Sequence, residues 1–206
     1  MIAIYGRATA WNVRKVLFFL EDVGIPYERL DYGRGFSPTN TPEFLALNPN
    51  ALVPVLADGS TVIWESHTIL RYLAAKNGPE SYYPSNLERR ALADQWLDWK
   101  IAHITQAIRP LFFRHFLKMG EFTDREVQEG EAECVRLFTI LDGQLGKTGA
   151  YVTGSDITIA DSSIGMAVHR WLTLPLKRPA LPNVERYYET LSRLPSYGKT
   201  IKIGMP

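Results

Sequence analysis

The stretch 48–66, NPNALVPVLADGSTVIWES, constrains the fold of this chain more than any other. It contains two short apolar runs, Leu52–Leu56 and Thr61–Trp64, of the kind that forms β-strands. Asp58-Gly59 between them is a common turn of a two-stranded hairpin. The residues that follow have apolar side chains at helical spacing, and Ser66 is a good N-cap for that helix. The stretch therefore predicts a hairpin that leads directly into a helix.

The residues before this hairpin alternate between strand and helix patterns. Ile2–Tyr5 predicts a strand, and apolar residues at helical spacing from Val13 predict a helix that Gly24 ends. Pro26–Tyr32 predicts a second strand, and Pro42–Leu47 a short helix. The order strand, helix, strand, short helix, hairpin and helix is that of an α/β domain.

The pattern changes after a segment of turn-forming residues, NGPESYYPSN. The sequence thus divides into an α/β domain over 1–76, a linker over 77–86 and an all-helical domain over 87–206. Pro110 is expected to end or kink the first of the later helices. These helices are predicted over Leu87–Met119, Thr123–Leu145, Thr158–Leu172 and Val184–Arg193.

The third of these helices opens with Thr158-Ile159-Ala160-Asp161, which fits a capping box. In such a box the carboxylate of the fourth residue reaches back to the first. We expect the box to be structural, contributing about 1 kcal/mol.

Two features of the hairpin and its helix suit a small peptide. Pro54 belongs at a strand start, an edge or a cis turn, and a cis bond would leave the backbone of Val53 open to an extended chain. The helix that starts at Ser66 favours a carboxylate, through its hydroxyl and its free N–H groups. Glu65 beside it suits an ammonium group. Together these groups fit a γ-glutamyl peptide.

Val53-Pro54, followed after a DG hairpin by Glu65-Ser66, resembles the cytosolic glutathione transferase superfamily, in its bacterial serine-like or Thr/Asn-type branch. The resemblance extends over nearly the whole chain and includes the Thr-Ile-Ala-Asp box. It implies a thioredoxin-like N-terminal domain followed by an all-α C-terminal domain. It also implies a homodimer, with glutathione bound at Val53, Pro54, Glu65 and Ser66.

A transferase must favour the thiolate of glutathione, because a free thiol with a pKa near ~8.5 is only about 3% ionised at pH 7. One hydrogen bond at a helix start can supply this stabilisation. Serine-type relatives place a serine where this chain has Ala10, so Thr9 and Asn12 are the candidate donors. Tyr5 competes by analogy with the tyrosine-type branch. The alternatives are a turn residue at Thr9, an N-cap at Asn12, sheet packing by Tyr5, and backbone N–H groups alone as donors.

The resemblance further implies that an apolar electrophile enters from the helical domain. Trp99 and His103 share a predicted helix face with Trp96 and Lys100, although packing between the domains would also explain that face. Arg170-Trp171 is another possible part of this pocket, and core packing is the alternative for it. Residues 109 and 112–115, after or next to Pro110, are further candidates. The predicted substrate pocket comprises Trp11, Trp99, His103, Phe113 and Trp171.

Composition excludes several other classes. Lys and Arg number 23 against 22 Asp and Glu, and this balance argues against nucleic acid as a partner. No apolar run reaches the ~20 residues of a membrane span, and the N-terminus resembles a folded strand rather than a signal. Cys134 is the only cysteine, which fits a reducing cytoplasm, and the four histidines lack metal-ligand spacing.

Three functions remain open from the sequence. The first is conjugation of the glutathione thiolate to an apolar electrophile, as in detoxification. The second is glutathione-dependent reduction of disulfides or peroxides, which the absence of a serine at position 10 favours. The third is a non-catalytic binding protein that keeps the fold.

Overall fold

The computed structural model describes residues 1–204; residues 205 and 206, at the end of the expected helical domain, lie outside the described part. The first part of the chain contains a sheet of four strands in the order β2-β1-β3-β4. The central strand β1 runs parallel to β2 and antiparallel to β3, and β3 and β4 form the predicted hairpin. The strands are β1 (Ile2–Tyr5), β2 (Tyr27–Leu30), β3 (Val55–Asp58) and β4 (Thr61–Trp64).

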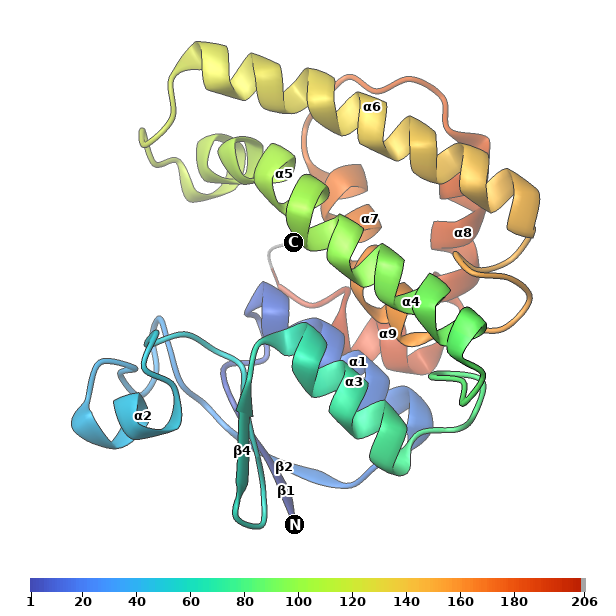
Figure 1. Ribbon diagram of the computed structural model, residues 1–206. Helices are drawn as coiled ribbons and strands as arrows, with labels where there is room; N and C mark the ends of the chain where they lie inside the picture. Colours follow the sequence, from blue (N-terminus) through green and yellow to red (C-terminus); the bar gives the residue numbers. More distant parts are fainter. Residues whose placement is uncertain (205–206) are drawn as a thin grey trace.

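Three helices complete this thioredoxin-like domain: α1 (Trp11–Val23), α2 (Pro42–Leu47) and α3 (Ser66–Asn77). Helix α1 begins two residues earlier than expected and ends where predicted, because Gly24 adopts the left-handed conformation with φ 74°. Helices α1 and α3 lie side by side between the sheet and the helical domain, whereas α2 lies apart from them (Figure 1). The starts of α1 and α3 are thereby brought to the junction of the two domains.

The rest of the described chain is helical, as predicted. Pro110 does not end the first helix, because α5 continues through it. Proline has no N–H to donate to the carbonyl of Gln106, but Gln106 is exposed, so water can bind that carbonyl instead. Two π-helical turns, η1 and η2, interrupt the α-helical hydrogen bonding. The elements are α4 (Leu87–Trp99), η1 (Lys100–Ile104), α5 (Thr105–Phe112), η2 (Phe113–Leu117), α6 (Asp124–Thr148), α7 (Ile159–Thr173), α8 (Pro182–Ser192) and α9 (Pro195–Thr200).

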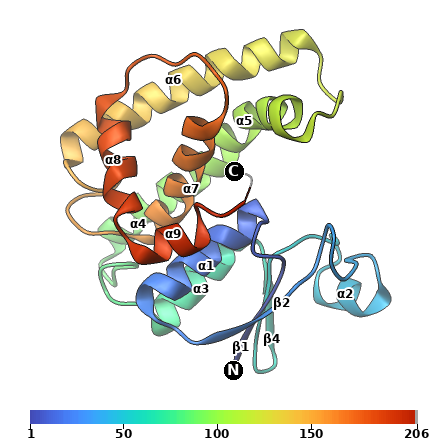
Figure 2. The same cartoon turned by 180° about the vertical axis from the view of Figure 1, so that it is seen from behind.

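Helix α9 was not expected from the sequence. It lies against α1 (Figure 2), where the Tyr197 ring meets the Phe18 ring edge-on at 5.5 Å. The Tyr197 hydroxyl donates to the carbonyl of Gly165 in α7 at 2.7 Å. Directly after α9, the carbonyl of Ile201 accepts from Arg14 at 3.0 Å. The end of the described chain is thus attached to the first helix.

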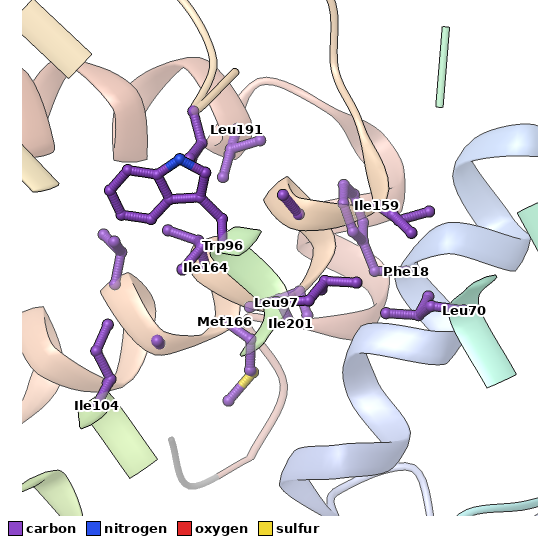
Figure 3. Close-up of a cluster of buried hydrophobic side chains, with 14 of the residues drawn as sticks. Phe18, Leu70, Trp96, Leu97, Ile104, Ile159, Ile164, Met166, Leu191 and Ile201 are labelled. Atoms are coloured by element: carbon purple, nitrogen blue, oxygen red, sulfur yellow. The ribbon is translucent and has the colours of Figure 1, made fainter. Parts of the chain in front are cut away.

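One continuous core joins the two domains (Figure 3). Phe18 of α1 and Leu70 of α3 belong to the same buried cluster as Leu97 of α4, Ile164 of α7 and Leu191 of α8. Because this apolar contact is shared, the relative position of α1 and the helical domain is set by packing. No helix within residues 1–204 has both the length and the apolar character required to cross a membrane.

The capping box at the start of α7 is confirmed and extends further than predicted. The fully buried Asp161 carboxylate accepts from the backbone N–H of Thr158 at 2.8 Å and from its hydroxyl at 3.1 Å. It also accepts from the backbone N–H of Val152 at 3.0 Å and from the Tyr187 hydroxyl at 2.9 Å. Asp161 therefore connects the start of α7 to the preceding loop and to α8.

Candidate active site

A pocket of about 710 Å³ lies where the two domains meet. The thioredoxin-like domain contributes its wall from the loops before α1, before α2 and before β3, and the helical domain contributes α5, η2 and one residue of α7. Its lining residues are Arg7, Thr9, Ala10, Trp11, Asn12, Gly33, Arg34, Phe36, Thr39, Ala51, Leu52, Val53, Thr105, Arg109, Phe112, Phe113, Leu117 and Arg170. The wall thus combines apolar and aromatic side chains with polar and cationic ones from both domains.

The start of α1 lies in the pocket, together with both candidate thiolate donors. Thr9 precedes the helix and Asn12 is its second residue, so Asn12 is not the N-cap. That position is occupied by Ala10, whose side chain offers no cap. The side chains of Thr9 and Asn12 are exposed and make no hydrogen bond to another described residue. Free N–H groups, a hydroxyl and an amide therefore converge where an anion would be stabilised.

Tyr5 lies outside the wall of this pocket. Its ring packs against Tyr32 at 5.6 Å between centroids, and Tyr32 in turn packs against Phe44 of α2 at 4.9 Å. This arrangement favours the packing interpretation of Tyr5.

The start of α3 differs in one respect from the prediction. Glu65, with φ 70°, is the N-cap, and Ser66 is the first residue of the helix. Ser66 is only 4% exposed, and its hydroxyl makes no hydrogen bond within residues 1–204. The Val53–Pro54 bond is cis, and neither backbone polar group of Val53 pairs with another described backbone group. Of these four residues, only Val53 lines the pocket itself.

The structure separates the predicted acceptor residues. Trp11 and Phe113 line the pocket, whereas Trp99 and His103 do not. The Trp99 ring instead packs edge-on against Trp96, with 4.8 Å between centroids, and lies 6.3 Å from the His103 ring. Lys100, the next residue, is buried, with Nζ 4.6 Å from the centre of the Trp11 ring.

Trp171 is also absent from the pocket wall. It is fully buried and stacks on Phe138 of α6, with 4.9 Å between ring centroids. Its neighbour Arg170 lines the pocket instead, so the core-packing alternative applies to the tryptophan alone. Among the candidates next to Pro110, Arg109, Phe112 and Phe113 line the pocket, whereas Arg114 pairs with Asp124 of α6 at 2.6 Å.

Four arginines gather at the pocket; Arg109 and Arg170 were candidates from the sequence, whereas Arg7 and Arg34 were missed. Arg7, Arg34, Arg109 and Arg170 line the pocket, and none of its described lining residues is Asp or Glu. Arg170 is 4% exposed, and its guanidinium carbon lies 3.3 Å from the centre of the Trp11 ring and 3.7 Å from that of Phe112. These residues are scattered along the chain, so no local pattern could reveal them; only the fold brings them together.

The electrostatic coupling within this cluster is visible in the pKa values. Burial, and then the charge of Arg34, lowers the pKa of Arg7. Burial and the charge of Arg7 lower that of Arg14 to about 10. Behind the pocket, burial together with Arg170 lowers the pKa of Lys100, and burial together with Lys100 lowers that of Lys15. Burial and neighbouring cations therefore favour the neutral form of the two lysines in the domain junction. No three potential metal ligands lie together among the described residues.

A thioredoxin-like domain joined to a helical domain, with an anion-attracting and partly apolar pocket between them, defines a two-domain protein that binds a small ligand. The model of the glutathione S-transferase N-terminal domain matches residues 2–75, and that of the C-terminal domain matches residues 124–190. The chain belongs to the glutathione S-transferase family.

Individual relatives match along the entire chain. Glutathione S-transferase GstB of Escherichia coli is 34% identical over 98% of this chain and 99% of its own. Glutathione S-transferase 1 of Zea mays is 29% identical over 98% of this chain and 97% of its own. The crystal structure of a theta class glutathione S-transferase from Xanthomonas axonopodis pv. citri, with glutathione bound, has a TM-score of 0.91 and 32% identity. It covers 100% of this chain and 99% of its own.

Proposed function

We propose that this glutathione transferase holds glutathione along Val53 and the start of α3, with its thiol at the start of α1, and transfers it to an apolar electrophile in the pocket. The observation that carries the proposal is the position of Thr9 and Asn12 on a wall shared with aromatic residues of the helical domain. A nucleophile stabilised there would face an acceptor held by Phe112 and Phe113.

The chemistry requires no protein base. The sulfur attacks an electrophilic carbon, a carbon–sulfur bond forms, the leaving group departs with its electron pair, and the thiol proton passes to solvent. Lowering the thiol pKa by ~2 units needs ~2.7 kcal/mol. A hydrogen bond to the charged sulfur contributes ~1.5–3 kcal/mol and the helix start ~0.3–1 kcal/mol. One donor from Thr9 or Asn12, added to the free N–H groups of α1, is sufficient.

Ser66→Ala tests the glutathione site. A calorimetric titration with reduced glutathione should be saturable for the wild type and at least tenfold weaker for the variant, because the γ-glutamyl carboxylate loses the hydroxyl at the start of α3. Tenfold corresponds to about 1.4 kcal/mol. The matched control is Ser60→Ala, in the exposed turn of the β3–β4 hairpin. Absence of saturable binding by the wild type would refute the proposed function.

The thiolate donor is tested by Thr9→Ala and Asn12→Ala. We expect the variant of the true donor to lose on the order of tenfold or more in turnover, since a hydrogen bond to a charged group contributes ~1.5–3 kcal/mol. Glutathione affinity should change less, because the bond forms with the thiolate. Initial rates with saturating glutathione measure this, with Tyr5→Phe for comparison. If Tyr5→Phe alone abolishes turnover, the assignment to the α1 start is wrong.

Acceptor assays separate the alternatives. Turnover of chloro-dinitrobenzene without reduction of hydroxyethyl disulfide supports conjugation, and the reverse pattern supports the reductase. Failure of both with intact glutathione binding indicates a non-catalytic binding protein.

The finer organisation also belongs to this proposal. We take the chain to act as a homodimer in the cytoplasm, in the bacterial serine-like or Thr/Asn-type branch, with domains over 1–76 and 87–206. Cys134 is a buried free thiol, and burial raises its pKa to about 12, which leaves it unreactive.

A further inference from the structure

The helical wall of the pocket carries a charge that glutathione alone does not explain. Arg109, on α5, is exposed and lines the pocket. No Asp or Glu within residues 1–204 lies within ion-pair distance of it. Arg114, little more than one turn further along the chain, is instead paired with Asp124 at 2.6 Å. Arg109 thus directs an unneutralised charge to the pocket.

The thioredoxin-like wall has enough cations for glutathione itself. Under the proposed function, the γ-glutamyl carboxylate occupies the start of α3 and the ammonium group faces Glu65. The second carboxylate then needs one cation, and Arg7 and Arg34 both lie on the thioredoxin-like wall. Arg109 lies on the opposite wall, where the acceptor would bind.

The surroundings of Arg109 are aromatic. Its guanidinium carbon lies 5.3 Å from the ring centre of Phe113 and 5.6 Å from that of Phe122. Phe112 and Leu117 extend the same apolar surface into the pocket. A cation beside aromatic rings can bind an aromatic body and a negative group of one molecule together.

We infer that the acceptor of this enzyme is an aromatic electrophile that carries a negatively charged group, and that Arg109 binds this group. The inference rests on the proposed function and deepens it. Arg7 and Arg34 on the opposite wall act in the same direction, because they attract anions into the pocket. A neutral acceptor would fill the aromatic wall and leave Arg109 without a partner.

A matched pair of acceptors tests this: 4-chloro-3,5-dinitrobenzoate and its methyl ester. In both, the glutathione sulfur forms a bond to the ring carbon, chloride leaves with the electron pair of the carbon–chlorine bond, and the thiol proton goes to solvent. Each kcat/KM is divided by the rate constant of the uncatalysed reaction with glutathione. We expect the normalised value to be at least tenfold higher for the anion than for the ester.

Arg109→Gln should reduce this ratio about tenfold, through the KM of the anionic acceptor. Arg125→Gln, which removes an exposed arginine on α6 outside the pocket wall, is the control and should leave the ratio unchanged. A wild-type ratio near one, or an Arg109→Gln ratio equal to that of the wild type, would overturn the inference.

Binding provides a second measurement that does not depend on turnover. Unreactive 3,5-dinitrobenzoate should bind at least tenfold more tightly than its methyl ester, and Arg109→Gln should remove the difference. The probe should bind with glutathione present. Competition between them would assign Arg109 to glutathione and refute the inference. Turnover of neither acceptor, with selective binding of the anion retained, would refute the proposed function alone.

Discussion

Asp161→Asn is expected to lower the free energy of unfolding by about 3 kcal/mol. One carboxylate oxygen accepts the backbone N–H of Val152, and the other accepts the backbone N–H of Thr158. In the asparagine variant an NH₂ group replaces one of these oxygens, so the backbone N–H that bonded to it faces another donor. The other backbone N–H keeps an oxygen acceptor, but that oxygen no longer carries the charge. Such losses amount to ~1–3 kcal/mol each.

Thermal unfolding measures the effect. For a chain of this size ~3 kcal/mol corresponds to a decrease in Tm of roughly 6–12 °C. Asp156→Asn is the control, because Asp156 is exposed and makes only a 3.5 Å contact with Arg89. Its effect should stay within about 0.5 kcal/mol. Equal decreases in the two variants would mean that the buried network around Asp161 contributes nothing special to stability.

Lys100→Met is expected to change how stability depends on pH. Burial is the main cause that lowers the pKa of Lys100 to about 7. Lys15 of α1 and Arg170 of α7 face it, and Glu65 partly offsets the positive charge at Lys15. Above pH 7 the unfolded chain, whose lysine has an ordinary pKa near 10.4, therefore binds more protons than the folded chain. As the pH falls from about 10.4 toward about 7, the unfolded chain gains a proton on Lys100 that the folded chain does not bind, so the folded chain becomes less stable.

Urea unfolding between pH 7 and 9 tests the prediction. The free energy of unfolding of the wild type minus that of Lys100→Met should rise with pH, approaching about 1.4 kcal/mol per unit. Lys100→Arg, which keeps its charge throughout this range, should be less stable than the wild type. Parallel wild-type and Lys100→Met curves would contradict the predicted burial of an uncharged amine.

The elements of the fold were predictable where local patterns determine them. The β3–β4 hairpin and the end of α1 at Gly24 follow from turn and cap residues, and the structure has both. Helix α9 was not predicted because it has only six residues, too few for a clear helical spacing of apolar side chains. Burial of Tyr197 in the core stabilises it. At Pro110 the helix does not end, and the packing of α5 against α6 accompanies its continuation.

The candidate residues of each domain divide between the pocket wall and positions outside it. Thr9, Trp11, Asn12 and Val53 line the pocket from the thioredoxin-like domain, and Phe113 lines it from the helical domain. Helical spacing places Trp99 and His103 on one face of a helix, but it does not say which face the fold turns toward the pocket, and neither residue lines it. The arginine cluster depends on contacts between distant segments, which one sequence does not reveal.

The contact between Arg14 and Ile201 joins residues 187 positions apart. Cells synthesise proteins at roughly 5–20 residues per second, so α1 would emerge from the ribosome about 10–40 s before α9 can cover it. During that interval the side of the Phe18 ring that Tyr197 covers in the folded protein lacks this partner. Slowing translation of the last segment should lengthen its exposure.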